Sequence, residues 1–205
     1  MTNGIKNIVF DFGGVLINLD KQACIDAFVG LGMENVREYL SDYRQDGIFR
    51  RLEIGAISPG QFRNEIRSKI GKPLSDQQID KAWMKFLLDV PAEKLDLLLQ
   101  LRKKYRVFML SNTNAIHIDG IIEPVFCRNG HTFDDYFEKA YFSYEIGWAK
   151  PDKEIFEYLL KDAGITAGET LFVDDAEANV AAAEAMGFKT YQPESFEDFS
   201  AVFYN

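Results

Sequence analysis

The chain has 205 residues, 47% of them hydrophobic and 27% charged, so it can bury a full core and intrinsic disorder is excluded for the chain as a whole. Its 23 basic and 32 acidic side chains give a net charge of −9. This charge argues against general binding to nucleic acids or anionic membranes, because the mean field of the protein repels phosphate groups.

The first predicted element is a short strand over residues 5–10, which ends at Asp11. Its apolar, partly β-branched run stops at Gly13 and Gly14, as is typical of a parallel strand buried on both faces. From about residue 21 to residue 88 the pattern predicts only helices, over 21–31, 36–43, 59–70 and 76–88. Two of these helix starts carry capping-box pairs, Ser58 with Gln61 and Ser75 with Gln78.

After a helix at 95–105 the pattern alternates between strands and helices. Strands are predicted at 106–110, 140–143, 170–173 and 189–191, with helices at 152–163 and 176–186. This order predicts an α/β fold, a doubly wound (Rossmann-like) parallel sheet with an α-helical cap inserted after the first strand. We place the catalytic core at 1–16 and 92–205, and the cap at 17–91.

The two cysteines, Cys24 and Cys127, lack the number and spacing of a disulfide framework, and we expect both to be buried or half-buried thiols. The N-terminal residues do not have the pattern of a secretion signal, and no segment is apolar enough for a membrane helix. We therefore expect a cytoplasmic protein.

Polar residues follow three of the predicted strands directly. Asp11 follows the first strand, Ser111 and Asn112 the second, and Asp174 and Asp175 the strand at 170–173. The carboxyl ends of strands in an open parallel sheet meet at one crevice, so these side chains are expected to converge there. Each feature alone is also typical of an ordinary turn or helix cap.

Three converging carboxylates need a cation, because at about 4 Å and an effective dielectric near 20 each like-charged pair costs roughly 4 kcal/mol. Hard oxygen ligands suit Mg²⁺. Lys150, in the loop after residues 140–143, would add a fixed positive charge, and Ser111 a hydroxyl donor. Together these groups could hold a phosphate dianion for attack by Asp11.

The chain resembles the haloacid dehalogenase-like hydrolase superfamily, most of whose members are Mg²⁺-dependent phosphatases. The resemblance covers nearly the whole chain, including the helical cap after the first strand. Four motifs carry it, in this order: DFGGVL at 11–16, LSNTN at 110–114, AKPD at 149–152 and VDDAEAN at 173–179.

The resemblance implies a role for each residue of the metal centre. Asp11 would be the nucleophile, which forms an aspartyl phosphate, and also a direct metal ligand. The backbone carbonyl of Gly13 and the carboxylate of Asp175 would be the other protein ligands. Asp174 and Asn179 would act through metal-bound water or by hydrogen bonding.

The resemblance also implies a phosphate site. Ser111 and Asn112 match the residues that bind phosphate in the family, and Lys150 matches the cation that neutralises the nucleophile and the phosphate. The backbone amides of Asn112 and Gly14 are further candidate donors. The expected partner is a small phosphorylated metabolite, with no nucleic acid or membrane, and a monomer is favoured.

One position departs from the family pattern. Most phosphatases of the superfamily have a general acid two residues after the nucleophile, where this chain has Gly13. A weak or missing acid favours substrates with good leaving groups, such as sugar 1-phosphates, or a substitute acid in the cap. The candidates are Asp20, Asp46 and Glu53. The alternatives are a catalytically weak or inactive phosphate-sensing or protein-binding module, and a metal-free dehalogenase.

Substrate choice is expected to depend on the cap. Arg50 and Arg51 stand beside apolar residues and could contact the substrate, although a solvated helix face has the same pattern. His117, shortly after the phosphate loop, could contact the substrate, but a place on a helix surface is favoured. Trp148, beside Lys150, could form the rim of a pocket or pack in the core.

Overall fold

The computed structural model describes residues 4–40, 47–194 and 196–204, and it contains a five-stranded parallel sheet. The strands lie in the order β3-β2-β1-β4-β5, which confirms the predicted doubly wound fold. The chain proceeds from β1 to β2 and β3 on one side and then crosses to β4 and β5 on the other. A crevice therefore opens at the carboxyl end of β1. The strand bounds are β1 Asn7–Phe10, β2 Arg106–Ser111, β3 Lys139–Phe142, β4 Thr170–Val173 and β5 Lys189–Tyr191.

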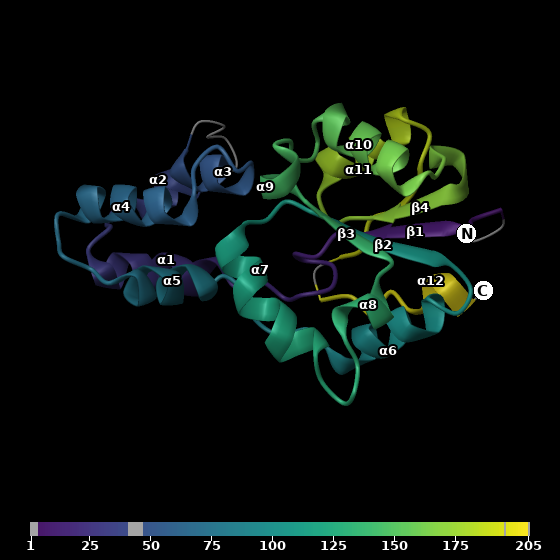
Figure 1. Cartoon of the computed structure of the whole chain (residues 1–205), viewed down its shortest axis with the longest axis horizontal. Helices are drawn as coiled ribbons and strands as arrows, with labels where there is room; N and C mark the ends of the chain where they lie inside the picture. Colours follow the sequence, from purple (N-terminus) through teal and green to yellow (C-terminus); the bar gives the residue numbers. More distant parts are fainter. Residues whose placement is uncertain (1–3, 41–46, 195, 205) are drawn as a thin grey trace.

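Helices cover both faces of this sheet, because alternate side chains of each strand point in opposite directions (Figure 1). In β1, Ile8 and Phe10 belong to one buried cluster and Val9 to another. The first cluster is completed by α6 (Ala92–Leu101), a π-helical turn (Ile122–Phe126), α8 (Phe133–Tyr136) and α12 (Ala201–Tyr204). The second is completed by α10 (Lys153–Ala163) and α11 (Glu177–Ala185).

Between β1 and α6 lies a helical insertion, which forms a separate body beyond the carboxyl ends of the strands (Figure 1). Its own core is aromatic: Phe28, Phe49, Phe62 and Trp83 are buried in one cluster, with ring centroids 4.7 Å apart for Phe49 and Trp83. The domain bounds at 16/17 and 91/92 stay a prediction. The insertion contains α1 (Lys21–Leu31), α2 (Val36–Tyr39), α3 (Ile48–Glu53), α4 (Pro59–Ile70) and α5 (Asp76–Met84).

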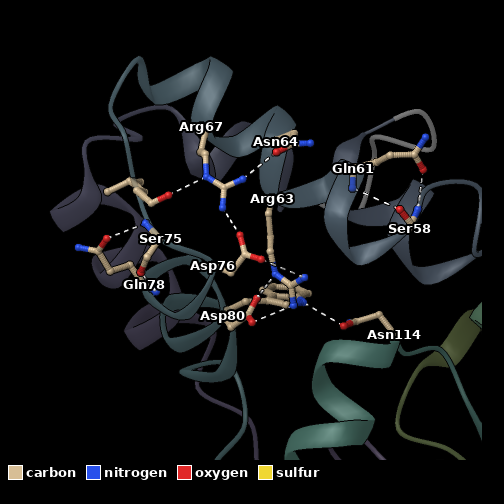
Figure 2. Close-up of polar contacts among 12 residues, drawn as sticks. Ser58, Gln61, Arg63, Asn64, Arg67, Ser75, Asp76, Gln78, Asp80 and Asn114 are labelled. Atoms are coloured by element: carbon tan, nitrogen blue, oxygen red, sulfur yellow. Dashed lines mark hydrogen bonds and ion pairs between the residues drawn. The ribbon is translucent and has the colours of Figure 1, made fainter.

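Side-chain hydrogen bonds determine where two helices of the insertion begin. Ser58 and Gln61 form a complete capping box at α4, and Ser75 and Gln78 form another at α5, as predicted (Figure 2). Between the two helices, the guanidinium of Arg63 donates to both carboxylate oxygens of Asp80, at 2.8 and 2.9 Å. The insertion therefore has polar as well as apolar contacts between its helices.

Two predicted helices of the insertion end early, and one helix was not predicted. The helix expected at 36–43 ends at Tyr39, and its last three positions lie outside the described residues; α3 lies in a segment for which no helix bounds were predicted. The helix expected at 76–88 ends at Met84, because the next residues pair with the chain entering the insertion. Leu19 and Leu87 form an antiparallel bridge, and the Leu88 N–H donates to the Asn18 carbonyl at 2.9 Å. Tertiary pairing here overrides the helical pattern.

The burial of Cys127, His117 and Trp148 was predicted wrongly or left open by the sequence. Cys24 is buried as expected, whereas Cys127 is exposed, so the prediction for Cys127 is wrong. His117, expected on a helix surface, is buried, because the insertion packs against its helix α7 (Ala115–Ile121). Trp148 is 48% exposed and is not a core residue. Among the described helices, none is long and apolar enough to cross a membrane.

Candidate active site

Asp11 lies at the carboxyl end of the central strand. Its backbone N–H continues the sheet by donating to the Val173 carbonyl at 2.8 Å, so the position of the residue is fixed by the ladder. The carboxylate accepts from the Phe12 N–H at 2.7 Å and pairs with the Lys150 ammonium at 2.8 Å. Burial raises the pKa of Asp11 to about 7. The nearby carboxylates add to this rise, and the positive charge of Lys150 opposes it.

Lys150 is a fully buried cation between two carboxylates. Its ammonium lies 2.8 Å from Asp11 Oδ1 and 2.6 Å from Asp174 Oδ2, and it donates to the Leu110 carbonyl at 2.8 Å. All three N–H donors of an ammonium group are thus engaged. Burial by itself would lower the pKa of Lys150, but the two carboxylates outweigh it and hold that pKa above its ordinary value.

The two adjacent aspartates after β4 have different surroundings. Asp174 is fully buried and accepts from Lys150, from the Ala176 N–H at 2.9 Å and from Asn179 Nδ2 at 2.9 and 3.1 Å. Asp175 is only partly buried, and burial raises the pKa of its carboxyl group, with Asp174 adding to the effect. Protein donors therefore satisfy Asp174, while the carboxylate of Asp175 faces Gly14.

These carboxylates form a group that fits a divalent cation. One oxygen each from Asp11, Asp174 and Asp175 lies within 4.8 Å of the others, and Lys150 is the cation that this group contacts in the described structure. Three carboxylates against one ammonium leave an excess of negative charge, which hard ions such as Mg²⁺ match. Gly14 is required here, since its φ is +75° and a Cβ would overlap the carboxylate of Asp175.

We expect the two adjacent aspartates to differ when replaced. Asp175→Asn should weaken Mg²⁺ binding strongly with little change in melting temperature, because the side chain has few protein partners. Asp174→Asn should weaken Mg²⁺ binding less but cost about 1–3 kcal/mol of stability, because Lys150 loses a charged partner. Titration calorimetry and thermal unfolding measure the two effects, and the opposite order of Mg²⁺ affinities would exchange the two roles.

The loop after β2 places Ser111 and Asn112 beside Lys150. Ser111 is buried, and its hydroxyl makes no hydrogen bond within the described part of the chain. The side chain of Asn112 donates to the Lys150 carbonyl and accepts from the Lys150 N–H, both at 2.8 Å. Asn112 therefore uses its amide group to hold the loop that carries Lys150. The Gly14 N–H is also engaged within the protein, with the Ile17 carbonyl at 2.9 Å.

A cavity of about 370 Å³ lies between the helical insertion and these loops. This volume suits a small metabolite. Asn112, Lys150 and Asn179 reach it from the sheet side, so the cavity adjoins the carboxylate group. The insertion contributes charged and aromatic side chains: Lys21, Tyr39, Phe49, Arg50, Glu53, Trp83 and Phe86.

Of the two arginines predicted to contact substrate, one lines this cavity. Arg50 does so, and its guanidinium lies 3.4 Å from Asp152 Oδ2 of the AKPD motif, across the gap between insertion and core. Arg51 points elsewhere and pairs with Glu65 of α4. The two neighbours differ because successive residues of a helix face directions about 100° apart.

The sequence did not indicate the contact that joins the insertion to the phosphate loop. The side-chain oxygen of Asn114 caps α7 by accepting from the His117 N–H, and it also accepts from Trp83 Nε1, both at 3.2 Å. His117 stacks on Trp83 with ring centroids 4.3 Å apart, and its Nε2–H donates to the Trp83 carbonyl. Burial lowers the pKa of His117 to about 4, so the ring is neutral at pH 7. Asn114 belongs to the LSNTN motif, whereas Trp83 belongs to none.

Comparison with known proteins identifies relatives of the whole chain. A family model described as haloacid dehalogenase-like hydrolase matches residues 5–187. The chain is 41% identical over 195 residues, and over 95% of both chains, to a D-ribitol-5-phosphate phosphatase of Bacteroides thetaiotaomicron.

Two solved structures are closely similar. A Bacteroides thetaiotaomicron HAD family enzyme in complex with magnesium and inorganic phosphate has a TM-score of 0.93 at 49% identity, covering 97% of this chain and 99% of that chain. A predicted HAD-like family hydrolase of Porphyromonas gingivalis has a TM-score of 0.91 at 42% identity, covering 98% and 97%. The likeness includes the helical insertion, since almost the whole chain is covered.

Proposed function

The chain belongs to the haloacid dehalogenase-like hydrolases, and from that premise we propose that it removes phosphate from a small polyol monophosphate. It is a magnesium-dependent phosphatase of that family, and the curated relative acts on D-ribitol 5-phosphate. The observation that carries the proposal is the group of Asp11, Lys150 and Asp175 beneath a cavity of metabolite size. Three gathered carboxylates repel one another unless a cation is bound, which argues against a metal-free dehalogenase.

The geometry supports a two-step hydrolysis. An oxygen of Asp11 attacks phosphorus and the ester P–O bond breaks, which leaves an aspartyl phosphate and releases the alcohol. Water then attacks phosphorus, the bond to Asp11 breaks, and phosphate leaves. Lys150 holds Asp11 in place and offsets its charge as the phosphate approaches. Asp11 and Asp175, with the Gly13 carbonyl, would hold magnesium, whose positive charge would offset the repulsion between carboxylate and phosphate.

Other residues of the site have supporting roles in this proposal. Ser111 donates its hydroxyl to a phosphate oxygen, since it lies at the end of β2 beside Lys150. Asn112 fixes the backbone of Lys150, and Asn179 fixes the carboxylate of Asp174. The substrate-facing wall comes from the insertion, where Arg50 and the aromatic side chains line the cavity.

Two classes of ester are candidates for the substrate. The relative's substrate favours a primary ester of a polyol, D-ribitol 5-phosphate, as the first compound to test. Gly13 favours a sugar 1-phosphate, because an anomeric oxygen is a better leaving group and needs less help from an acid. We propose the polyol phosphate as the main substrate and keep the sugar 1-phosphate as the second candidate.

A panel of phosphate monoesters distinguishes these two candidates. We expect kcat/KM to be at least about tenfold higher for D-ribitol 5-phosphate than for glucose 1-phosphate, and EDTA to abolish both activities until Mg²⁺ is restored. The opposite preference would support the sugar 1-phosphate. Absence of turnover with the whole panel and with p-nitrophenyl phosphate would favour the non-catalytic phosphate-sensing module.

Replacing each of two neighbouring arginines of the insertion tests whether the insertion contacts the substrate. Arg50→Ala should raise KM for D-ribitol 5-phosphate about tenfold, since Arg50 lines the cavity, and should change kcat little. Arg51→Ala is the matched variant, because its side chain pairs with Glu65 instead. Steady-state kinetics of both variants provide the comparison. Equal effects on KM would assign both residues to surface charge or to general stability.

A further inference from the structure

Gly13 leaves the reaction without the usual acid, and the atoms nearest to a Cβ at this position, among the described residues, all belong to an apolar side chain. A Cβ built on Gly13 meets Leu19, with Cδ1 3.3 Å away, so an apolar side chain borders that position. Departure of an alkoxide from a primary ester needs a proton, and general acid catalysis typically contributes about 10²–10⁴-fold. The proton must therefore come from another group that lines the cavity.

Among the described residues that line the cavity, Glu53 is the one that carries a carboxyl group. Asp20, a second candidate from the sequence, caps α1 by accepting from the Ala23 N–H at 2.8 Å. Asp46 lies outside the described residues. Glu53 shares a helix face with Arg50 and Phe49, three and four residues earlier, and all three line the cavity.

The end of α3 is attached directly to the core at the active-site loops. The Ser143 hydroxyl donates to the Glu53 carbonyl at 2.5 Å and also accepts from the Thr113 N–H at 2.9 Å. Thr113 follows Ser111 and Asn112 in the phosphate loop. One hydroxyl group therefore joins the backbone of Glu53 to that loop. Two residues later Gly55 approaches the Tyr144 carbonyl so closely that a Cβ would overlap it.

We propose that Glu53 is the acid–base residue that replaces the missing side chain at position 13; this rests on the proposed phosphatase function. As Asp11 attacks phosphorus and the ester bond breaks, the Glu53 carboxyl group gives its proton to the leaving alcohol oxygen. In the second step, the Glu53 carboxylate takes a proton from the attacking water while the bond from phosphorus to Asp11 breaks. The cycle consumes one water and restores the carboxyl group.

Lys21 is the rival proton donor from the insertion, since it also lines the cavity. It differs from Glu53 in two respects. Lys21 is an exposed residue at the first position of α1, whereas Glu53 is partly buried. In addition, the Ser143 hydroxyl joins the backbone of Glu53 to the loop that follows β2. Lys150, which lines the cavity from the core, already donates to two carboxylates and a carbonyl.

The proposal is tested by comparing how Glu53→Gln changes kcat/KM for esters with poor and with good leaving groups. Glu53→Gln keeps the shape and size of the side chain but removes the proton. We expect kcat/KM for n-butyl phosphate, whose leaving group is a poor one without hydroxyls, to fall by about 10²-fold or more. For p-nitrophenyl phosphate, whose leaving group needs no proton, kcat/KM should change less than about threefold. This ratio reports only the steps up to departure of the first product.

Three results would overturn the assignment of Glu53. Equal losses on both esters would indicate a structural role, and a loss confined to KM for D-ribitol 5-phosphate would indicate binding of substrate hydroxyls. A selective loss on n-butyl phosphate in Lys21→Met, with none in Glu53→Gln, would give the role to Lys21. Wild-type turnover of p-nitrophenyl phosphate tests the phosphatase function separately. Its absence would contradict that function, whatever Glu53 does.

Discussion

Replacing Asp11 with Asn is expected to abolish steady-state turnover, by roughly 10³-fold or more, while the fold is kept. The amide is nearly isosteric with the carboxylate but cannot form the aspartyl phosphate. Lys150 retains Asp174 as a charged partner, so no buried cation is left alone. The removed charge also relieves repulsion with the neighbouring carboxylates, and the melting temperature should therefore not fall in the absence of metal.

Kinetics with p-nitrophenyl phosphate and thermal unfolding measure these two effects of Asp11→Asn. Asp26→Asn is a matched control, since Asp26 is exposed on α1 and accepts from Gln22 within its own helix. The control should be unchanged in both measurements. Substantial turnover by Asp11→Asn, in a sample shown by mass spectrometry to be free of reversion to Asp, would remove Asp11 from its role as nucleophile.

Replacing Lys150 with Met is expected to remove activity and also to destabilise the fold by about 3–5 kcal/mol, the cost of breaking a buried ion pair. The ammonium is fully buried and is the described cation that contacts both Asp11 and Asp174. Without it these two carboxylates, with Asp175 beside them, repel one another in a poorly solvated place. Methionine fills much of the same volume, so the loss reports the charge more than a cavity.

A double variant separates charge from packing at this position. Asp174→Asn in the Lys150→Met background removes one of the stranded carboxylates and should recover part of the lost stability, without restoring turnover. Lys153→Met serves as the control, because Lys153 is exposed and three residues away. Denaturant unfolding of wild type, Asp174→Asn, Lys150→Met and the double variant gives the coupling energy. A Lys150→Met protein as stable as wild type would show that the buried ion pairs do not hold these loops together.

The sequence alone predicted the architecture and the gathering of the acidic group. Strand–helix alternation is a local pattern, and parallel strands have their carboxyl ends at one edge, so Asp11, Asp174 and Asp175 had to approach one another. Helix limits were predicted well where capping residues determine them. Residues 21–31 and 59–70 form helices with the predicted bounds, and the second begins at the Ser58 capping box.

Only the tertiary structure decided how the insertion meets the core. Pairing of Leu19 with Leu87 ended α5 early, and packing on Trp83 buried His117. The direction of one helix placed Arg50 at the cavity and Arg51 away from it. Likewise, Asn112 uses its side chain to hold Lys150, a partner 38 positions away. Such contacts join residues distant in the chain, and their geometry depends on the packing of whole elements rather than on any periodicity within one of them.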